Sequence, residues 1–422
     1  MLKFLRKSYW AHARTARNWS DSLLKSGPAF RDVVLHDYFG RRAALRPVSG
    51  EVSLRASLAV RWLLRAHDAT VDDGVSYGKF PGSGSPGWEP SYPETTGYIM
   101  TSLLTYAEQA GEPDLVDRVT RMGHWEASVQ MPSGAVQGGK VTDPEHQKPA
   151  TFNTGMVLDG YVSLLERRKD AIIESAAERA VAFLLGDMTK DGLFATNGPV
   201  VSDDEIKLYN VLCAWALHRH GRLTGEPDTC AAAIRAAEGA LRFQAANGWF
   251  SENCLTRPAT PLTHTIGYTL QGLLEVAVLA ERDDILAAVE CGYKPIIEAI
   301  EPNGYLVGRF DSGWRPAADW SCLTGSAQLA IVGYRLASIR GDQDYADAAD
   351  RLLNFLKAVQ RVNSGDPDFD GALAGSYPIL GDYMTGGYPN WATKYLLDAL
   401  MLQAERHGIQ LGTEEPRQEV AA

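Results

Sequence analysis

The sequence predicts an all-α fold, an (α/α)6 toroid in which twelve helices form an inner and an outer ring, with short β-hairpin-like loops at its mouth. Three observations lead to this prediction. A glycine turn recurs along the chain, an amphipathic helical segment precedes each turn, and an apolar helical segment follows it. A helix without a polar face is usually buried, so the apolar segments are expected inside the ring.

The recurring turn joins a small or polar residue to glycine at intervals of roughly sixty residues. Asp-Gly and Asn-Gly pairs are tight-turn signals because glycine tolerates a positive φ. The six turns are Asp73-Gly74, Ser133-Gly134, Asp191-Gly192, Asn247-Gly248, Asn303-Gly304 and Asp370-Gly371.

The outer ring is expected from six amphipathic segments with charged faces, and the inner ring from six apolar ones. The outer helices are predicted over 52–67, 113–129, 171–187, 228–244, 284–300 and 343–361. The inner helices are predicted to open near Glu94, Asn153, Tyr209, His264, Thr324 and Asn390.

These elements divide the chain into a toroidal catalytic domain over 49–405, an N-terminal helical extension over 1–48 and a polar tail over 406–422. The predicted connections from outer to inner helices are long and rich in tryptophan and tyrosine, whereas the reverse connections are short. Long loops in a compact domain are usually functional. We therefore expect a ligand site at the N-terminal ends of the inner helices, whose positive dipole ends suit an anionic or polar ligand.

Composition excludes several classes of function. The 422 residues carry a net charge of −11 without a block of Lys or Arg, which argues against a nucleic-acid partner. No apolar stretch is long enough for a membrane span. The five cysteines are odd in number and form no Cys-x-x-Cys pair, so we expect reduced thiols, a cytoplasmic location and no zinc site.

The N-terminus is basic from the start and has no apolar core like that of a secretory signal. Its Leu2, Phe4 and Trp10 beside Lys3 and Arg6 could form a peripheral contact with an anionic membrane. The favoured alternative is a helix that lies on the toroid.

Aromatic and amide side chains gather in the predicted mouth. Flat rings offer an apolar face to the C–H surface of a sugar, and amides can bond its hydroxyls. The alternative for each residue is loop packing or helix capping. The residues predicted to bind a sugar substrate are Trp88, Tyr92, Asn153, Tyr209, Asn210, Trp320, Tyr383, Tyr388, Asn390 and Trp391, with Trp249, Trp314, Thr263 and Gln328 as further candidates.

Glu94 is the first catalytic candidate, directly before the first inner helix in an aromatic segment. Such surroundings would raise its pKa and suit a general acid. The alternative is a capping box, because Ser91 stands three residues earlier. Asp319, beside Trp320 and across the predicted ring, is the second candidate, since glycoside hydrolysis uses two carboxyl groups. Its alternative is a helix N-cap.

Three weaker carboxylates could replace Asp319 in this pairing. They are Asp311, Asp382 and Glu252 in neighbouring loops.

His264 is the third catalytic candidate, because histidine titrates near neutral pH. With Tyr209 or Tyr383 it would instead support proton abstraction from a uronate, as in a lyase or an epimerase. Possible clamps for the enolate are Lys207, Arg309, Arg315 and Lys394.

The run Asp203-Asp204-Glu205 could hold a metal or diphosphate, but it is favoured as a helix start. No nucleotide or redox motif is present, so the sequence implies no cofactor.

The sixfold pattern resembles the six-hairpin glycosidase-like superfamily of (α/α)6 toroids, which includes glycoside hydrolases, polysaccharide lyases and sugar epimerases. Helix starts such as Phe152 to Met156 and His264 to Tyr268 are similar to inner-helix starts there. The resemblance implies a carbohydrate-active enzyme, with hydrolysis of an oligosaccharide or polysaccharide favoured and a uronate lyase or epimerase as the alternative.

A second resemblance competes with the first. Gln244 to Phe250 is similar to the Gln/Trp repeat of prenyltransferase and terpene-cyclase toroids. The Asp-x-Asp-Asp motif of the cyclases is missing from the sequence. A non-catalytic glycan-binding or polysaccharide-biosynthesis protein is the remaining alternative, because one fold hosts many functions.

Overall fold

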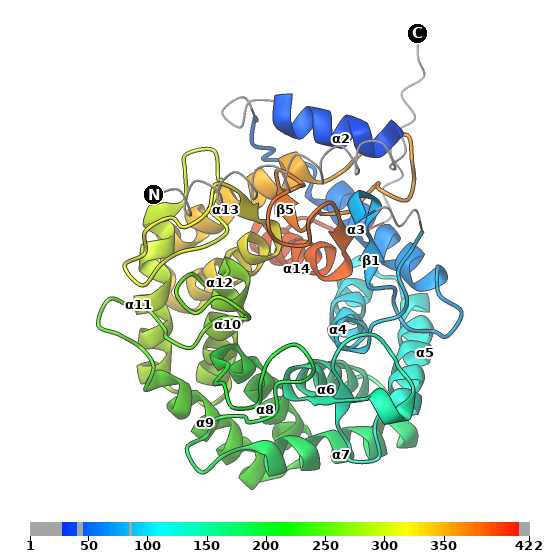
Figure 1. The fold of residues 1–422 in the computed structure, drawn as a ribbon, viewed down its shortest axis with the longest axis vertical. Coiled ribbons are helices and arrows are strands. Elements are labelled where there is room, and N and C mark those ends of the chain that lie inside the picture. The colour runs from blue at the N-terminus through cyan, green and yellow to red at the C-terminus, as the bar shows by residue number, and fades with distance from the viewer. Residues whose placement is uncertain (1–27, 40–44, 84–86, 413–422) are drawn as a thin grey trace, which may run out of the picture.

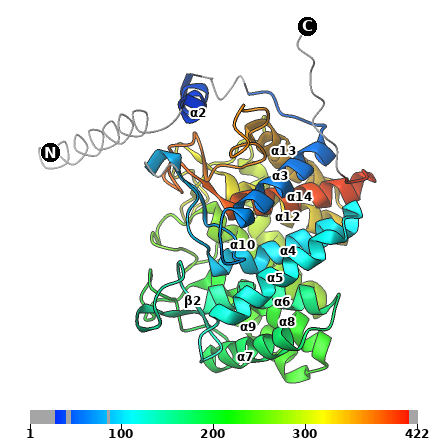
Figure 2. The same ribbon diagram turned by 90° about the vertical axis from the view of Figure 1, so that its right-hand side faces the viewer.

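The computed structural model describes residues 28–39, 45–83 and 87–412, and its helices form a closed double ring (Figure 1). Thirteen α-helices occur in these residues. One of them, α2 (Pro28–Phe39), lies outside the ring at one edge (Figures 1 and 2). The other twelve alternate between an outer and an inner position, which confirms the predicted (α/α)6 toroid.

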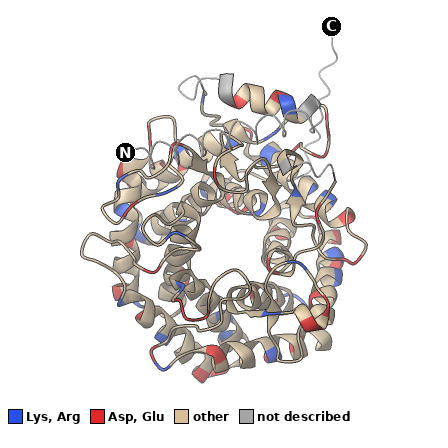
Figure 3. Cartoon of the chain, viewed as in Figure 1, with Lys and Arg blue, Asp and Glu red and all other residues tan. Residues whose placement is uncertain are grey.

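The outer ring consists of α3 (Val52–Asp68), α5 (Asp114–Val129), α7 (Ala171–Asp187), α9 (Pro227–Leu241), α11 (Asp283–Ala299) and α13 (Gln343–Val359). Their ends lie within three residues of the predicted ranges at almost every boundary. Figure 3 shows that Lys, Arg, Asp and Glu gather on this outer ring, while the inner ring is mostly uncharged. The amphipathic pattern therefore reports which face of each helix meets solvent.

The inner ring consists of α4 (Pro93–Ala110), α6 (Thr151–Leu165), α8 (Leu212–Thr224), α10 (Thr263–Leu279), α12 (Leu323–Arg340) and α14 (Asn390–His407). A short 3-10 turn, η4 (Leu208–Val211), precedes α8. In α6 all residues over 151–164 are buried, because neighbouring inner helices and an outer helix cover the helix on all sides. This surrounding contact explains the apolar sequences of the inner helices.

The turn glycines connect each repeat to the next outer helix. Gly304 has a φ of +86°, and a side-chain Cβ there would lie 1.9 Å from the carbonyl oxygen of Arg351 in α13. At Gly371, φ is +96° and a Cβ would lie 2.0 Å from the carbonyl oxygen of Leu58 in α3. Gly371 thus brings the last repeat against the first outer helix and closes the ring.

Glutamine side chains reinforce the same junctions. The Gln244 amide nitrogen donates a hydrogen bond of 2.7 Å to the carbonyl oxygen of Ala288 in α11. Gln360 donates in the same way to the carbonyl oxygens of Arg55 and Gly371, at 3.2 and 3.0 Å. The Gln/Trp-like segment is therefore accounted for by helix-to-helix bonding within this toroid.

Threonines on inner helices fix the segments that follow the turns. The backbone N–H groups of Val75, Val136 and Leu373 donate to the hydroxyl oxygens of threonines on α4, α6 and α14 at 2.8 to 3.0 Å. The acceptors are Thr96, Thr154 and Thr393. These bonds hold three of the six long loops against the inner ring.

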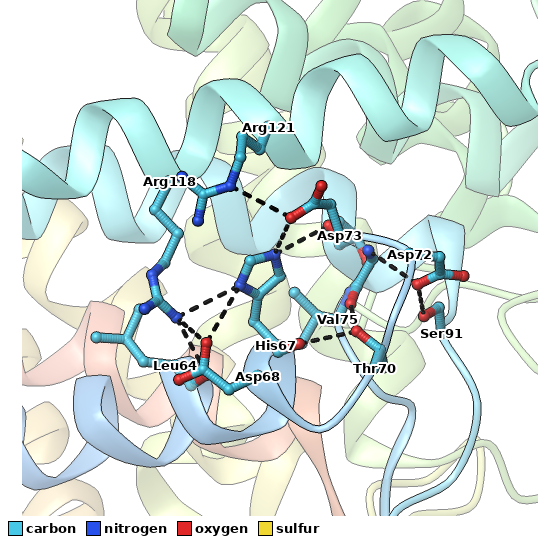
Figure 4. A network of polar contacts seen from close by, with 12 residues as sticks. Leu64, His67, Asp68, Thr70, Asp72, Asp73, Val75, Ser91, Arg118 and Arg121 are labelled. Atoms are coloured by element: carbon cyan, nitrogen blue, oxygen red, sulfur yellow. Dashed lines mark hydrogen bonds and ion pairs between the residues drawn. The ribbon is translucent and has the colours of Figure 1, made fainter.

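A polar network anchors the loop between α3 and α4 (Figure 4). The buried His67 side chain donates from Nε2 to the carbonyl oxygen of Asp73, at 3.1 Å. Arg118 Nη1 contacts His67 Nδ1 at 3.4 Å and donates to Asp68 at 2.6 Å. Burial, followed by the nearby Arg118 charge, lowers the pKa of His67, so the ring is neutral and Nδ1 accepts.

Three two-stranded sheets lie among the long loops, and each of their strands is two residues long. The long loops gather on one face of the ring (Figure 2). β2 (Val136–Gln137) pairs with β3 (Pro149–Ala150) within one loop. β1 (Gly78–Lys79) pairs with β6 (Tyr388–Pro389), and β4 (Ser321–Cys322) pairs with β5 (Ser376–Tyr377). The last two sheets join loops from different repeats. The hairpin-like form that the sequence predicts occurs in β2–β3 and in isolated antiparallel bridges within one loop, such as Lys79 to Trp88 and Phe310 to Pro316.

The predicted start of α4 near Glu94 is confirmed, but the alternative capping box there and the favoured helix start at Asp203 are wrong. α4 begins at Pro93 with Tyr92 as N-cap and no side-chain cap, so Ser91 and Glu94 form no capping box. Asp203 accepts a hydrogen bond of 2.6 Å from the backbone N–H of Asn197 in a loop and opens no helix. Within the part of the chain that the structure describes, no group of three His, Cys, Asp or Glu side chains is arranged to hold a metal ion.

The terminal predictions are only partly covered. Residues 1–27 and 413–422 lie outside the described residues. They include the basic segment with Leu2, Phe4 and Trp10, for which the sequence allows a membrane contact but favours a helix on the toroid. Over the described ranges, no helix combines the length and apolar character that crossing a membrane requires.

Candidate functional site

A cavity of about 280 Å³ opens among the long loops at the N-terminal ends of the inner helices. Five of its wall segments are the starts of α4, α6, α10 and α14 and the turn η4. Loops before α4, α6, α8, α10 and α14 complete the wall. The lining residues are Tyr77, Tyr92, Glu94, Gly138, Gly139, Ala150, Phe152, Asn153, Asn197, Pro199, Val200, Val201, Tyr209, Leu255, His264, Thr265, Tyr268, Tyr383, Met384 and Trp391.

A larger hollow of about 700 Å³ lies between α11 and α13 on the outer surface. It is a wide groove lined by side chains such as Lys294, Glu298, Asp347 and Arg351, without an aromatic ring. The cavity at the mouth is smaller, but it is less open to solvent and contains the aromatic and titratable groups. We therefore take the mouth cavity as the candidate active site.

Glu94 is the one carboxyl group that lines this cavity in the described chain. Its Oε2 accepts a hydrogen bond of 2.9 Å from the Tyr92 hydroxyl group. Burial raises the pKa of Glu94 to about 7, and the bond from Tyr92 lowers it by a smaller amount. Near neutral pH the Glu94 carboxyl group can therefore carry a proton and release it.

His264 projects into the same cavity from the first turn of α10. Its Nδ1 lies 2.7 Å from Oε1 of Gln328 on α12. An amide oxygen only accepts hydrogen bonds, so Nδ1 carries the proton and Nε2 keeps its lone pair. Burial lowers the pKa of His264 to about 4, which leaves the ring neutral at physiological pH.

Aromatic rings form most of the remaining wall and hold one another in place. Tyr77 packs edge-on against Tyr92 and Trp391, at centroid distances of 5.0 and 4.8 Å. Trp391 Nε1 donates to the Tyr383 hydroxyl oxygen at 2.8 Å. On another part of the wall, Phe152 contacts Tyr209, with centroids 5.4 Å apart. Such rings offer flat apolar faces with polar edges, the combination that a sugar ring requires.

Tyrosines close the cavity toward the centre of the toroid. Tyr268, one helical turn after His264, lies 6.0 Å from Tyr395 between ring centroids, and Tyr395 lies 5.7 Å from Tyr98. Lys394 Nζ is 4.0 Å from the centroid of Tyr395 and pairs with Asp398 at 2.7 Å. These three tyrosines therefore fill the inner ring next to the cavity, which is accessible from the loop face.

The structure brings many of the predicted residues together. Those that line the cavity are Glu94, His264, Tyr92, Asn153, Tyr209, Tyr383 and Trp391. Asn153 is held there by a hydrogen bond of 3.0 Å from its Nδ2 to the carbonyl oxygen of Gln137. Whether each of these residues acts on a substrate remains a prediction.

Asp319 is not among them. Its side chain is exposed, although the next residue, Trp320, is buried. The substitutes Asp311, Asp382 and Glu252 do not line the cavity either. The geometry therefore gives no support to the predicted pairing of Asp319 with Glu94.

The other predicted binding residues support the loops around the cavity. Trp88 packs on Trp62 with centroids 5.2 Å apart, and Tyr388 packs on Phe369 at 5.3 Å. Trp320 lies 5.8 Å from the guanidinium carbon of Arg309. Asn210 donates to Asn197, and Asn390 donates to Ser76 and Thr95.

The predicted enolate clamps do not line the cavity and are bonded elsewhere. Lys207 pairs with Glu205, Lys394 with Asp398 and Arg315 with Asp311, each at 2.7 to 2.8 Å. Arg309 donates to the carbonyl oxygen of Thr260 at 2.7 Å.

Sequence reasoning missed several lining residues. The sequence could have identified Phe152 and Tyr268 as lining residues. Phe152 directly precedes the predicted site residue Asn153, and Tyr268 follows His264 by one helical turn. Tyr77, Asn197 and the apolar run Pro199, Val200 and Val201 lie in loops, where no periodicity shows which side chains point inward.

Solved structures share this architecture. No protein-family model matches the chain, and a search of curated proteins finds no relative. An unsaturated glucuronyl hydrolase specific for heparin is 17% identical, with a TM-score of 0.69 over 86% of this chain and 100% of the other.

Two further structures are similar. The unsaturated glucuronyl hydrolase of Bacillus sp. GL1 is 15% identical, with a TM-score of 0.65 over 84% of this chain and 96% of its own. Cellobiose 2-epimerase from Bacillus thermoamylovorans B4167 is 7% identical, with a TM-score of 0.64 over 80% and 95%. At these identities the similarity shows the fold alone, which is the (α/α)6 toroid.

Proposed function

We propose that this protein is a carbohydrate-active enzyme that hydrolyses a glycosidic bond in an oligosaccharide or polysaccharide, with Glu94 as the proton donor. The observation that carries the proposal is a single carboxyl group with a pKa raised to about 7, enclosed in a cavity of aromatic rings. The hydrolases and the epimerase that share the fold support a sugar substrate.

The chemistry begins with binding of a sugar ring against the aromatic wall. Protonated Glu94 donates its proton to the glycosidic oxygen as the C–O bond breaks, so the leaving group departs as a neutral alcohol. The Tyr92 hydroxyl group orients Glu94 through its 2.9 Å hydrogen bond and stabilises the carboxylate that forms. Amide and hydroxyl groups such as Asn153 and Tyr209 bond the sugar hydroxyls.

The water that attacks the sugar needs a second group. Because no other carboxyl group of the described chain lines the cavity, we assign this role to Nε2 of His264, which has a free lone pair. A neutral imidazole can accept the proton of the water. The earlier prediction that Asp319 supplies the second group is tested beside this assignment.

The test is turnover of an oligosaccharide panel, followed as newly released reducing ends. Glu94→Gln should lower kcat/KM by ~100- to 10,000-fold, because the amide keeps the shape of the side chain but cannot donate an acidic proton. His264→Gln should lower it by ~100-fold. Asp117→Asn, which neutralises an exposed carboxylate on α5, is the matched control and should retain full activity.

The variant Asp319→Asn decides whether His264 or Asp319 activates the attacking water. Normal turnover of this variant favours His264, whereas a loss comparable to that of Glu94→Gln would restore the carboxylate pair. Normal turnover of Glu94→Gln would reject the proposed mechanism. Binding of sugars without any turnover would favour a non-catalytic glycan-binding protein.

A second candidate reaction is proton transfer on one sugar ring, as in an epimerase or a lyase. The observation that favours it is that one cavity holds both a proton donor and a proton acceptor. Near neutral pH Glu94 can carry a proton, and the neutral His264 ring can accept one. Deuterium from heavy water entering the carbon framework of the sugar, or a product that absorbs as an enone, would identify this reaction. Hydrolysis gives neither signal.

We also propose a cytoplasmic location. Cys213, Cys230, Cys254, Cys291 and Cys322 are all free thiols, three of them buried, which fits a reducing compartment. Fractionation of cells followed by immunodetection tests this location. The described residues and the comparisons give no support to a membrane contact.

A further inference from the structure

We propose that the sugar unit bound beside Glu94 is uncharged, a neutral hexose and not a uronate, a sulfated sugar or a phosphorylated sugar. This inference rests on the proposed function and names the substrate class of the same cavity. It depends on which charged groups face the ligand.

The lining has one acid and no Lys or Arg among the described residues. Beyond Glu94, the polar groups are hydroxyl groups, amides and the neutral His264 ring, all of which bond well to sugar hydroxyls. Sites that bind carboxylate, sulfate or phosphate groups usually present Arg or Lys to them. The lining thus offers many partners for hydroxyls but no cation for an anion.

Three cations next to lining residues are already paired with carboxylates. Lys140 Nζ lies 5.5 Å from the centroid of the lining residue Tyr77 but forms an ion pair with Glu89. Arg257 pairs at 2.7 Å with Asp382, the residue before Tyr383.

Lys207 is a third cation near the cavity. Its Nζ donates at 3.1 Å to the carbonyl oxygen of the lining residue Leu255, and it pairs at 2.8 Å with Glu205. An anionic substrate would have to break an ion pair to gain any of these three cations as its counter-ion.

The energetics favour a neutral ligand. An anion that leaves water for this largely aromatic cavity loses hydration, and the lining can replace it only with neutral hydrogen-bond donors and helix N-termini, without a paired cation. When Glu94 is ionised, a second anion also meets a like charge at short range. Protonation of Glu94 removes this repulsion but supplies no counter-ion, so both protonation states disfavour an anionic sugar.

The inference separates this chain from two enzymes that share its fold. Their names describe glucuronyl hydrolases, one of them specific for heparin, which are enzymes for anionic sugars. The present chain is 15–17% identical to them and has a cavity without a cation in the described lining.

The experiment compares matched sugar pairs that differ by one carboxylate. Methyl α- and β-glycosides of glucose, galactose and mannose, and disaccharides that end in each, are tested against the corresponding uronates. Binding to the full chain is followed by ligand-observed NMR, and turnover is followed on the disaccharides. We expect at least one neutral compound to bind, with its uronate partner at least ~10-fold weaker.

Two variants locate the origin of the preference. Glu94→Gln should reduce the difference in affinity between the neutral and uronate ligands, because it removes the negative charge that repels the uronate. Asp117→Asn removes a carboxylate of equal charge on the outer surface and should leave this difference unchanged. Val200→Arg places a cation at an exposed lining residue and should raise uronate affinity ~10-fold, whereas Val200→Gln should not.

The outcomes are distinguishable. A uronate that binds as tightly as its neutral partner, or more tightly, overturns the inference and leaves the proposed function standing. If no sugar of either set binds or is turned over, the proposed function fails and the inference fails with it.

Discussion

Glu94 is the residue on which the chemistry depends, and its protonation should set the pH dependence of the enzyme. Its pKa is raised to about 7, so the acid form is present below pH 7 and is lost as the pH rises through that value. The pKa of His264 is lowered to about 4, so its base form is lost below that pH. We expect a bell-shaped profile of kcat/KM with limbs near pH 4 and pH 7.

The measurement is kcat/KM from pH 3.5 to 9 on the best substrate of the panel. The residual activity of His264→Gln should keep the alkaline limb and lose the acidic one. A wild-type profile that stays flat from pH 6 to 9 would contradict the role of Glu94 as general acid.

The same burial that suits Glu94 for catalysis should lower the stability of the fold. The pKa of this group is about 7 in the folded protein, against an ordinary value of 4.5, so stability falls as the pH rises from about 4.5 to about 7, and the loss is complete above that value. Glu94→Gln should therefore stabilise the protein by ~1–3 kcal/mol at pH 8 and by much less at pH 5.

Urea unfolding at the two pH values measures this difference. Asp117→Asn serves as the control, because its exposed carboxylate should show no such dependence on pH. Equal effects of Glu94→Gln at pH 5 and pH 8 would show that the carboxyl group is not desolvated in the folded state.

Predictability at the residue scale depended on where a residue stands relative to a helix. Glu94, Asn153 and His264 open inner helices, and the helix axis determines that their side chains reach the cavity. Asp319 and Trp320 stand in an irregular segment, where one is exposed and the next is buried. Loop backbone geometry sets this alternation, and no periodic pattern records it.

Helices and turns were the most predictable elements. The hydrophobic period of 3.6 residues predicted the outer helices, and the continuous apolar runs predicted the inner helices. The pairing of loop strands from different repeats, as in β1 with β6, depends on ring closure and has no local signal.

The turn glycines provide a test at the scale of elements. Gly304→Ala should cost ~3 kcal/mol or more, because the new Cβ would collide with the Arg351 carbonyl oxygen in addition to the unfavourable φ of +86°. Gly341→Ala is the matched control, with a φ of +69° and no atom within 4 Å of the new Cβ. It should cost only ~1–2 kcal/mol.

Urea unfolding of the two variants measures how much free energy of unfolding each substitution costs. Equal losses would mean that glycine is needed at the repeated turns for its backbone conformation alone. The contact between each turn and the next outer helix would then contribute little.

For the whole molecule, the sixfold repeat predicted a closed ring, and the structure confirms it through Gly371 and the pairing of α14 with α3. The sequence also indicated the correct face for a cavity, because the long loops occur only after outer helices. It could not indicate that Tyr98, Tyr268 and Tyr395 fill the ring next to the cavity, since tyrosines on apolar helices are usual in any core.

The most direct test of the account is a crystal structure of the Glu94→Gln variant with a neutral oligosaccharide that the wild-type enzyme turns over. We predict a sugar ring against Trp391 and Tyr209, with its glycosidic oxygen within hydrogen-bond distance of the residue 94 amide. An oligosaccharide bound on the outer surface, or in the cavity with its glycosidic oxygen far from residue 94, would contradict the account.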